Sequence, residues 1–205
     1  MQLDDAVEFW FTVGSTYTYL TVARLDRVAA STGVRFVWRP FNARPIMQEM
    51  NNVPFITKPV KLAYMWRDVE RRAGNYGLPI KVPAPYPLRE FDLANRVAVL
   101  GAMEGWCPEY VRATYQRWFV AGQEAGSEPN LSDSLREIGQ DPARAISLAR
   151  SEDVGRAYDA ATDEARRQNI FGAPTFVTCG ELFWGDDRLD DAVTWRQRHD
   201  SPSTV

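Results

Sequence analysis

The hydrophobic and polar positions change their period along the chain, and each period predicts a kind of element. Residues 7–11 form a short apolar run that is typical of a β-strand. From Ser15 the apolar residues recur at spacings of three and four, which predicts a helix that Gly33 ends. Residues 34–39 carry apolar side chains at every second position before Pro40, so a second strand is expected there. A strand, a helix and a strand in this order favour a parallel pair with a right-handed crossover.

The middle of the chain, from about residue 42 to residue 168, shows helical periodicity and no convincing strand. A Pro-rich loop at residues 82–87 divides this helical block. Asp141 is followed by proline and has the form of a helix cap, and Ser151 is expected to cap the next helix. The helices predicted by periodicity alone cover residues 61–73, 89–104 and 108–121.

Strand patterns return near the C-terminal end. Residues 175–178 and 181–184 are β-rich runs, and the two residues between them predict a tight hairpin. Residues 185–187 then open a last helix, which is expected to run through about Arg196.

The assembled order is β-α-β, a helical block and β-β-α, which predicts an α/β fold. This order corresponds to a thioredoxin-like sheet whose two halves are separated by a large, all-helical insertion. We therefore expect residues 1–41 and 169–205 to form a discontinuous thioredoxin-like domain, and residues 42–168 to form the insertion.

The net charge and the first residues disfavour a nucleic-acid-binding, a secreted and a membrane-spanning protein. The 205 residues include 24 Lys and Arg and 27 Asp and Glu, and the net charge of −3 does not favour a general nucleic-acid binder. The first five residues carry acids where a secretory signal has basic residues, and no stretch approaches the roughly 20 apolar residues that span a membrane. We expect a cytoplasmic protein that binds neither nucleic acid nor membrane.

The cysteines and the histidine argue against several chemistries. Cys107 and Cys179 lie far apart, and neither belongs to a C-x-x-C pair, so neither a redox dithiol nor a metal site is indicated. Both are expected to be buried packing residues. The single histidine, His199, is expected to be solvated, which disfavours a histidine triad and a multi-histidine metal site. No metal is expected.

Three short segments could carry chemistry. Ser15 stands between a predicted strand and a predicted helix, where its hydroxyl would lie among free backbone N–H groups. Its simplest role is to cap the helix. The alternative is that the helix N-terminus holds an anion, because the helix dipole and the free amides attract negative charge there.

The second and third segments flank the returning strands. Pro174 is either the first residue of a strand or a cis-proline, which would free the backbone of Ala173 to pair with an extended, peptide-like ligand. Asp186 and Asp187 either cap the last helix or receive the ammonium group of a ligand whose carboxylate meets the helix amides. The latter reading predicts a zwitterionic ligand.

The three segments together resemble the glutathione-dependent 2-hydroxychromene-2-carboxylate isomerases and the related kappa-class glutathione transferases. Those families have a thioredoxin fold with a helical insertion, like the DsbA-type thiol oxidoreductases, but lack the C-x-x-C pair. The resemblance covers essentially the whole chain. It includes residues 39–41 (RPF), 61–68 (KLAYMWRD) and 77–79 (GLP), and the segments around Phe171 and Trp184.

The resemblance implies glutathione as the cofactor and Ser15 as the catalytic residue that hydrogen-bonds its sulfur. Lys58 or Lys61 would pair a substrate carboxylate, and Trp66 and Tyr86 would form walls for an aromatic substrate. The other residues implied to bind glutathione are Asn52, Ala173, Pro174, Trp184, Gly185, Asp186 and Asp187.

The chain departs from the family pattern after the serine. Many members have proline there, whereas this chain has Thr16, whose hydroxyl could compete for the sulfur.

The expected function is glutathione-dependent cis–trans isomerisation of 2-hydroxychromene-2-carboxylate-type aromatic acids, by transient thiolate addition, in aromatic hydrocarbon degradation. A homodimer is expected. The alternatives are a kappa-class-like transferase or peroxidase and a non-catalytic peptide-binding module. A disulfide oxidoreductase is disfavoured, because Ser15 occupies the nucleophile position and no partner cysteine follows.

Overall fold

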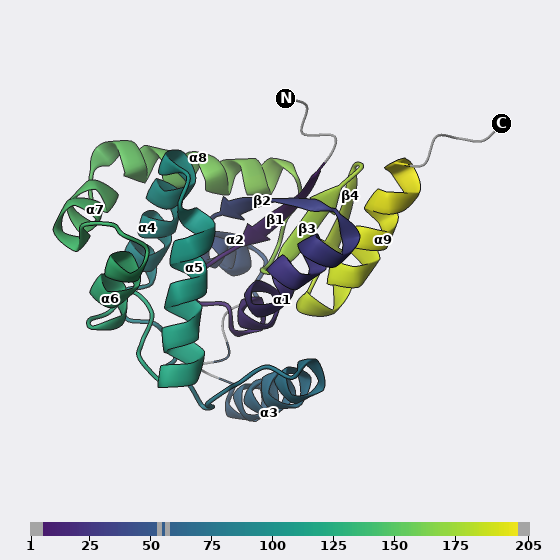
Figure 1. Ribbon diagram of the computed structural model, residues 1–205, viewed down its shortest axis with the longest axis horizontal. Coiled ribbons are helices and arrows are strands. Elements are labelled where there is room, and N and C mark those ends of the chain that lie inside the picture. Colours follow the sequence, from purple (N-terminus) through teal and green to yellow (C-terminus); the bar gives the residue numbers. More distant parts are fainter. Residues whose placement is uncertain (1–5, 53–54, 56–57, 201–205) are drawn as a thin grey trace.

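The computed structural model describes residues 6–52, 55 and 58–200 and contains a four-stranded mixed sheet in the order β2-β1-β3-β4 (Figure 1). β1 pairs in parallel with β2 and antiparallel with β3, and β3 and β4 form a hairpin. The predicted strands, the parallel pair and the α/β class are therefore confirmed. The strands are β1 (Ala6–Phe11), β2 (Arg35–Pro40), β3 (Thr175–Thr178) and β4 (Glu181–Trp184).

The two faces of β1 pack against different helices because successive side chains point to opposite sides of a strand. Phe9 and Phe11 belong to the main hydrophobic cluster, together with residues of α1 (Thr16–Thr32) and α9 (Leu189–Asp200). Trp10 lies in a second cluster with residues of α2 (Ala43–Glu49) and with Ala165 of α8 (Glu152–Arg167). The sheet is thus covered by helices on both faces, as Figure 1 shows.

The described part of the segment between β2 and β3 contains helices joined by loops and no strand. The side chain of Asp141 accepts a hydrogen bond from the Ala143 N–H, and that of Ser151 accepts one from the Val154 N–H, which confirms both predicted caps. The elements are α2, α3 (Pro59–Tyr76), α4 (Phe91–Glu104), α5 (Cys107–Gln116), the π-helical turn η3 (Arg117–Ala121), α6 (Asn130–Glu137), α7 (Pro142–Ala149) and α8.

Several boundaries differ from the sequence-based expectation. Pro40 is the last residue of β2 rather than its terminator, and it is tolerated because β2 is an edge strand. The helix expected over residues 108–121 is α5 followed by the π-helical turn. The last helix is preceded by a 3₁₀ turn, η4 (Asp186–Arg188).

The two cysteines occupy different environments. Cys107 is 2% exposed in the main cluster, whereas Cys179 is exposed, so the expected burial of Cys179 is wrong. Cys179 and Gly180 form the β3–β4 turn with φ values of 50° and 77°. A two-residue turn of this kind lies at the tip of a hairpin and leaves its side chains in solvent.

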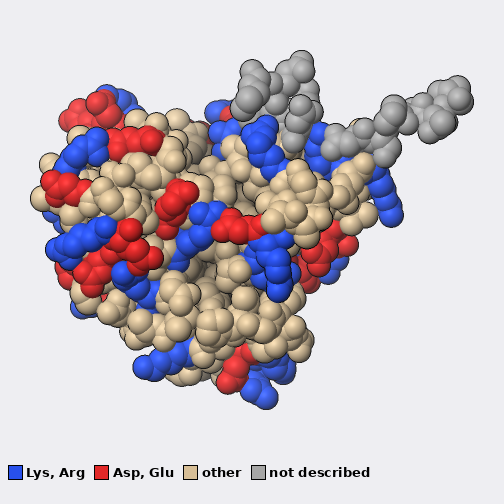
Figure 2. All heavy atoms as spheres, in the orientation of Figure 1, with Lys and Arg blue, Asp and Glu red and all other residues tan. Residues whose placement is uncertain are grey.

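Charged side chains are distributed over the molecule without a basic stripe on the face that Figure 2 shows. Blue and red residues alternate there, and many form pairs one turn apart on a helix, such as Arg136 with Asp133. None of the described helices is long and apolar enough to cross a membrane.

Candidate active site

Ser15 occupies the N-cap position of α1, but its side chain does not cap the helix. Its hydroxyl donates instead to the Ala173 carbonyl, 2.9 Å away and 158 residues further along the chain. No acidic side chain lies in the first turn of α1. Among the residues that the structure describes, the first amides of α1 therefore have no side-chain acceptor, and they favour an anion beside Ser15.

A buried amide fixes the loop that leads into α1. Asn95 of α4 is 0% exposed, accepts from the Val13 N–H at 2.7 Å and donates to the Val13 carbonyl at 2.8 Å. The Tyr115 hydroxyl of α5 is within hydrogen-bond distance of the carbonyls of Thr12 (3.1 Å) and Ser15 (2.9 Å). The helical insertion thus holds the loop before α1 in place. The sequence analysis missed both residues, and neither has a local sequence signal.

Gly14 has a structural reason to be glycine. Its φ is 125°, and a Cβ on it would lie 2.8 Å from the ring of Phe91. Any side chain here would be strained and would collide with α4, so the close approach of this loop to the insertion requires glycine.

The other two segments meet Ser15 through the Ala173–Pro174 peptide, which is cis. The Ala173 carbonyl accepts from Ser15, and the Pro174 carbonyl accepts from the Gly185 N–H at 2.9 Å. The Ala173 N–H has no hydrogen bond within the part of the chain that the structure describes. One backbone amide beside Ser15 is therefore open to an extended ligand.

Trp184 lies next to this peptide and is 49% exposed. Its ring packs on Phe171 with the centroids 4.9 Å apart. A Cβ on Gly172 would lie 2.5 Å from the Trp184 Nε1, so glycine is needed at that position. The half-exposed indole forms a flat apolar surface beside the open Ala173 amide.

Asp186 has a role that the sequence did not predict. Its carboxylate is 0% exposed and is held by Arg24 at 2.6 Å and by Arg72 of α3 at 2.9 Å. The hydroxyls of Thr21 and Tyr76 lie 3.3 Å from its two oxygens. Both oxygens are fully occupied, so the expectation that Asp186 receives a ligand ammonium is corrected: Asp186 joins α1, α3 and the η4 turn.

Asp187 remains accessible, with a side chain that is 46% exposed. Its carboxylate is 3.0 Å from Arg188 and 3.9 Å from Arg72. Burial alone would raise the pKa of Asp187, but the hydrogen bond from Arg188 and the charge of Arg72 outweigh it and hold that pKa below its ordinary value. Gly185 has a φ of 116°, and a Cβ on it would lie 2.5 Å from the Asp187 Oδ1. Because glycine has no Cβ, the Asp187 carboxylate has room to fold back over the turn.

Thr16 does not face the open side of the site. It is 4% exposed, and its hydroxyl donates to the Met65 sulfur of α3 at 3.2 Å. The expectation that Thr16 could compete for a ligand sulfur is therefore wrong. A second bond, from the Tyr17 hydroxyl to Asp68 at 2.9 Å, also ties α3 to the start of α1.

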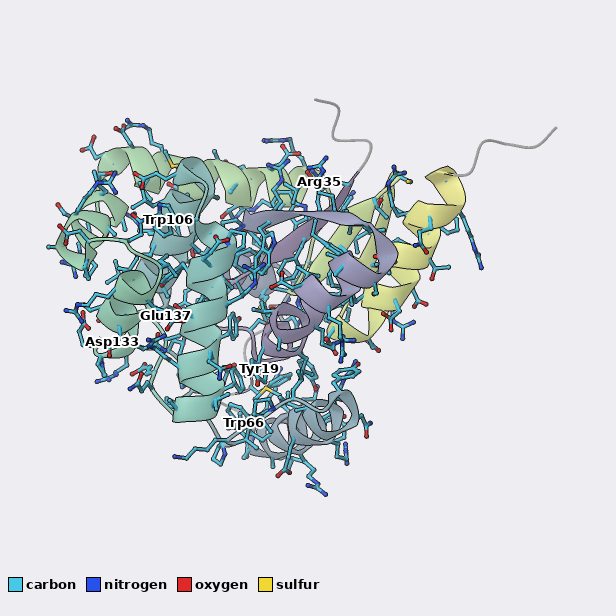
Figure 3. The ribbon with its side chains drawn as sticks, in the orientation of Figure 1. Tyr19, Arg35, Trp66, Trp106, Asp133 and Glu137 are labelled. Atoms are coloured by element: carbon cyan, nitrogen blue, oxygen red, sulfur yellow. The ribbon has the colours of Figure 1, made fainter. Side chains whose placement is uncertain are left out.

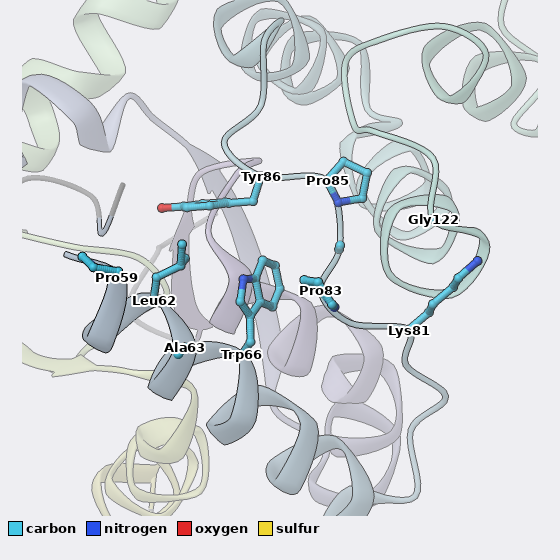
Figure 4. Close-up of a pocket in the computed structure, with 10 residues that line it drawn as sticks. Pro59, Leu62, Ala63, Trp66, Lys81, Pro83, Pro85, Tyr86 and Gly122 are labelled. Carbon is cyan, nitrogen blue, oxygen red and sulfur yellow. The ribbon is translucent and has the colours of Figure 1, made fainter. Parts of the chain in front are cut away.

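Trp66 and Tyr86 line one pocket of about 740 Å³, together with Pro59, Leu62, Lys81 and Pro85 among others (Figure 4). Their rings meet edge to face with the centroids 5.9 Å apart. Trp66 and Tyr19, both labelled in Figure 3, also pack against Phe119. The predicted aromatic walls thus belong to a single pocket beside α3.

The remaining predicted residues are not among those that line this pocket. Lys58 is the residue before α3 and Lys61 is exposed in its first turn, and neither lines the pocket. Lys81, which the sequence analysis did not single out, does line it. Asn52 is exposed after α2, and its backbone N–H donates to the Met47 carbonyl at 2.7 Å. No hydrogen bond joins Asn52 to Ser15 within the described residues.

A metal centre has no candidate among the residues described. Over residues 6–52, 55 and 58–200, no group of three or more His, Cys, Asp or Glu could hold a metal ion. His199 is exposed, and its Nδ1 lies 2.8 Å from the Trp195 carbonyl.

The fold and the Ser15 site define a class of protein. The sequence matches the DsbA-like thioredoxin domain over residues 6–194, so the chain belongs to this family. The resemblance to 2-hydroxychromene-2-carboxylate isomerases and the predicted thioredoxin-like fold are thereby confirmed at the level of family and fold.

Particular relatives share most of their length with this chain. The 2-hydroxychromene-2-carboxylate isomerase of Sphingobium xenophagum is 26% identical over 92% of this chain and 96% of its own. A glutathione S-transferase kappa 2 of Caenorhabditis elegans is 23% identical over 89% and 88%. A solved 2-hydroxychromene-2-carboxylate isomerase superposes with a TM-score of 0.83 at 25% identity, covering 95% of both chains. These relatives support an enzyme of the isomerase and glutathione transferase group.

Proposed function

We propose that this chain is a glutathione-dependent isomerase of 2-hydroxychromene-2-carboxylate-type aromatic acids, acting in the degradation of aromatic hydrocarbons. The proposal rests on one observation above all: the Ser15 hydroxyl lies against the Ala173 carbonyl at a helix N-terminus that no side chain caps. The relatives that carry this isomerase name support it. A cytoplasmic location and a homodimer are part of the same proposal.

The groups around Ser15 fit a glutathione molecule. The Ser15 hydroxyl and the α1 amides suit a sulfur anion, and the open Ala173 N–H suits the cysteinyl backbone. Asp187 is the accessible carboxylate for the γ-glutamyl ammonium, and Trp184 offers an apolar surface between them. The Ser15 hydroxyl, the Ala173 N–H and the Asp187 carboxylate thus match the sulfur, the cysteinyl backbone and the γ-glutamyl ammonium of the tripeptide.

The hydrogen bond and the helix N-terminus at Ser15 together supply energy of the magnitude that ionising a bound thiol requires. A free thiol has a pKa of about 8.5, and lowering it by about two units requires roughly 2.7 kcal/mol. One hydrogen bond to a charged acceptor contributes roughly 1.5–3 kcal/mol, and a helix N-terminus adds roughly 0.3–1 kcal/mol. No general base is needed.

Bound glutathione would supply a thiolate that adds reversibly to a conjugated carbon, so that a double bond becomes a single bond able to rotate. Ser15 would hold the negative charge on the sulfur, and the Ala173 backbone would orient the cysteinyl unit. A serine also cannot form a disulfide with its ligand, which leaves the sulfur free to react with carbon.

The test is to mix the protein with 2-hydroxychromene-2-carboxylate, with and without glutathione, and to follow the absorbance of the acid. We expect conversion only with glutathione present and no net loss of glutathione. Conversion at the same rate without glutathione would overturn the proposal that glutathione is the cofactor. If the acid does not react, the proposal that it is the substrate is overturned.

A kappa-type transferase is the second candidate, because the kappa 2 relative aligns over most of the chain. It would share the Ser15 site and differ in the acceptor. Net consumption of glutathione with an electrophile such as 1-chloro-2,4-dinitrobenzene would favour it. Binding of extended peptides without glutathione affinity would favour a non-catalytic module instead.

A further inference from the structure

The pocket beside α3 has apolar, aromatic walls and three polar side-chain atoms that have no partner among the described residues. The Lys81 ammonium, the Tyr86 hydroxyl and the Trp66 indole N–H make no hydrogen bond or ion pair with any other residue that the structure describes. Among the described residues that line the pocket, Lys81 is the one with a charged side chain. A cation in an apolar, aromatic-walled pocket is complementary to an anion that carries an aromatic body.

The polar atoms lie at different ends of the pocket. In Figure 4 the Lys81 side chain extends beside Gly122, while the Tyr86 hydroxyl lies on the far side, towards Pro59 and Leu62. Trp66 stands between them, with its ring edge to face with Tyr86. The pocket therefore offers a cation at one end, a neutral hydroxyl at the other and a flat indole in the middle.

We propose that this pocket binds a flat aromatic acid lengthwise, with Lys81 as the residue that pairs its carboxylate. The inference rests on the proposed function only for the reaction that follows binding. In this proposal Lys81 takes the place of Lys58 and Lys61 as the partner of the carboxylate. A second polar group of the ligand then lies near the Tyr86 hydroxyl.

Lys81 is well placed for this role because its backbone is fixed. The Lys81 N–H donates to the Phe119 carbonyl at 2.7 Å, and the Trp118 indole N–H donates to the Pro85 carbonyl at 2.8 Å. Two hydrogen bonds thus hold residues 81–85 on the π-helical turn. A rigid backbone lowers the entropy cost of positioning the ammonium.

The Lys81 stem also has room along Gly122. A Cβ on Gly122 would lie 3.6–3.8 Å from the Lys81 Nζ, Cδ and Cε atoms, which is ordinary contact. The stem therefore packs beside the glycine while its ammonium stays available. This is the usual arrangement of a lysine that covers apolar surface and keeps its charge in water.

The experiment measures binding by calorimetry, without glutathione and without turnover, using 2-naphthoate and its neutral analogue 2-naphthamide. The wild-type protein is expected to bind the acid several-fold more tightly than the amide, the range of a partly exposed ion pair. Lys81→Met should abolish this preference and leave amide binding unchanged, whereas Lys81→Arg should keep most of it. Lys61→Met is the matched control and should behave as the wild type.

Each outcome decides the proposal. An unchanged preference in Lys81→Met, or a loss in Lys61→Met, would overturn the assignment of Lys81, and equal wild-type affinities for acid and amide would overturn the anionic ligand class. Amide binding and circular dichroism report whether Lys81→Met folds. The binding experiment contains no glutathione, so it is independent of the isomerase assay. A failed isomerase assay would not contradict the role of Lys81 in binding, and a failed binding experiment would not contradict the role of Ser15.

Discussion

The Ser15 hydroxyl has one proton to donate, and the Ala173 carbonyl accepts it at 2.9 Å. For the hydroxyl to donate to a sulfur, that carbonyl needs a different donor. The amide N–H of an extended ligand is a suitable replacement, because it would pair with the Ala173 carbonyl as a neighbouring strand does. The exchange would then cost little, and the Ser15 hydroxyl would be free to donate to a bound thiolate.

The first prediction concerns this hydroxyl. Ser15→Ala should lose roughly 1.5–3 kcal/mol of thiolate stabilisation, since it removes one hydrogen bond to a charged acceptor. The thiol pKa of bound glutathione should rise by about one to two units, with a thiolate-limited rate about ten- to a hundredfold lower. Ultraviolet titration of the thiolate measures the pKa. Thr16→Val is the control, because the Thr16 hydroxyl faces Met65; an equal shift in both variants would contradict the role of Ser15.

The second prediction concerns the two thiols. Cys107 is buried, and its burial raises the pKa of the thiol, so it is both inaccessible and protonated. Cys179 is exposed at the hairpin turn. A thiol-specific reagent should therefore titrate one cysteine in the folded protein and both in denaturant. Rapid modification of both thiols without denaturant would show that α5 does not bury Cys107 as described.

At the scale of elements, the junction of α1, α3 and η4 depends on one buried carboxylate. Arg24 is 4% exposed and pairs with Asp186, while its guanidinium stacks 3.7 Å from the centre of the Tyr76 ring. Arg72 approaches the same carboxylate from α3. Removing the negative charge would leave a buried arginine without its counter-ion, which is costly in a region of low dielectric constant.

The third prediction tests this junction. Asp186→Asn should lower the free energy of unfolding by roughly 3 kcal/mol or more, because the variant leaves Arg24 buried and unpaired. Asp133→Asn, which breaks an exposed pair with Arg136, should cost less than about 1 kcal/mol. Urea unfolding at neutral pH compares the two. Similar small losses for both variants would mean that Asp186 contributes no more than a surface pair.

The sequence predicted the elements whose pattern is long or sharply bounded. The β3–β4 hairpin has the predicted ends, and the caps at Asp141 and Ser151 are confirmed because cap chemistry is local. The helices α2 and α6 were not predicted, since 7 and 8 residues give too few turns for a period to appear.

The site was predictable only where its parts are motifs. Resemblance pointed to the segments of Ser15, Pro174 and Gly185, which the structure brings into contact. The pairing of Asp186 was not predictable, because Arg24 and Arg72 lie 162 and 114 residues away. Lys81 could not be separated from Lys58 and Lys61, since the pocket combines α3 with a turn at Gly122.

At the scale of the whole molecule, one hydrophobic cluster crosses the boundary between the predicted thioredoxin-like part and the insertion. It joins Phe9 and Leu20 of the former to Val97, Tyr110 and Val154 of the latter. Hydrogen bonds from Asn95 and Tyr115 to the α1 loop cross the same boundary. Neither part can lose its packing without exposing apolar surface of the other.

The fourth prediction follows from this shared core. Unfolding in denaturant should be a single transition, with tryptophan fluorescence and far-ultraviolet circular dichroism giving the same midpoint. Tryptophans lie in both parts, as at Trp10 and Trp118, so fluorescence reports on each. Two separated midpoints would contradict a common core and would favour independent folding of the insertion.

The attachment of α3 has a consequence for how such a protein could change its preferences. Met65 and Asp68 fasten the later turns of this helix to α1, and Arg72 fastens them to Asp186, whereas Pro59, Leu62 and Ala63 of its opening turns line the pocket. Substitutions at Pro59, Leu62 or Ala63 would thus change the shape of the pocket without altering the contacts that join α3 to α1 and to Asp186. The opening turns of α3, which line the pocket, can therefore vary in sequence independently of its later turns, which anchor the helix.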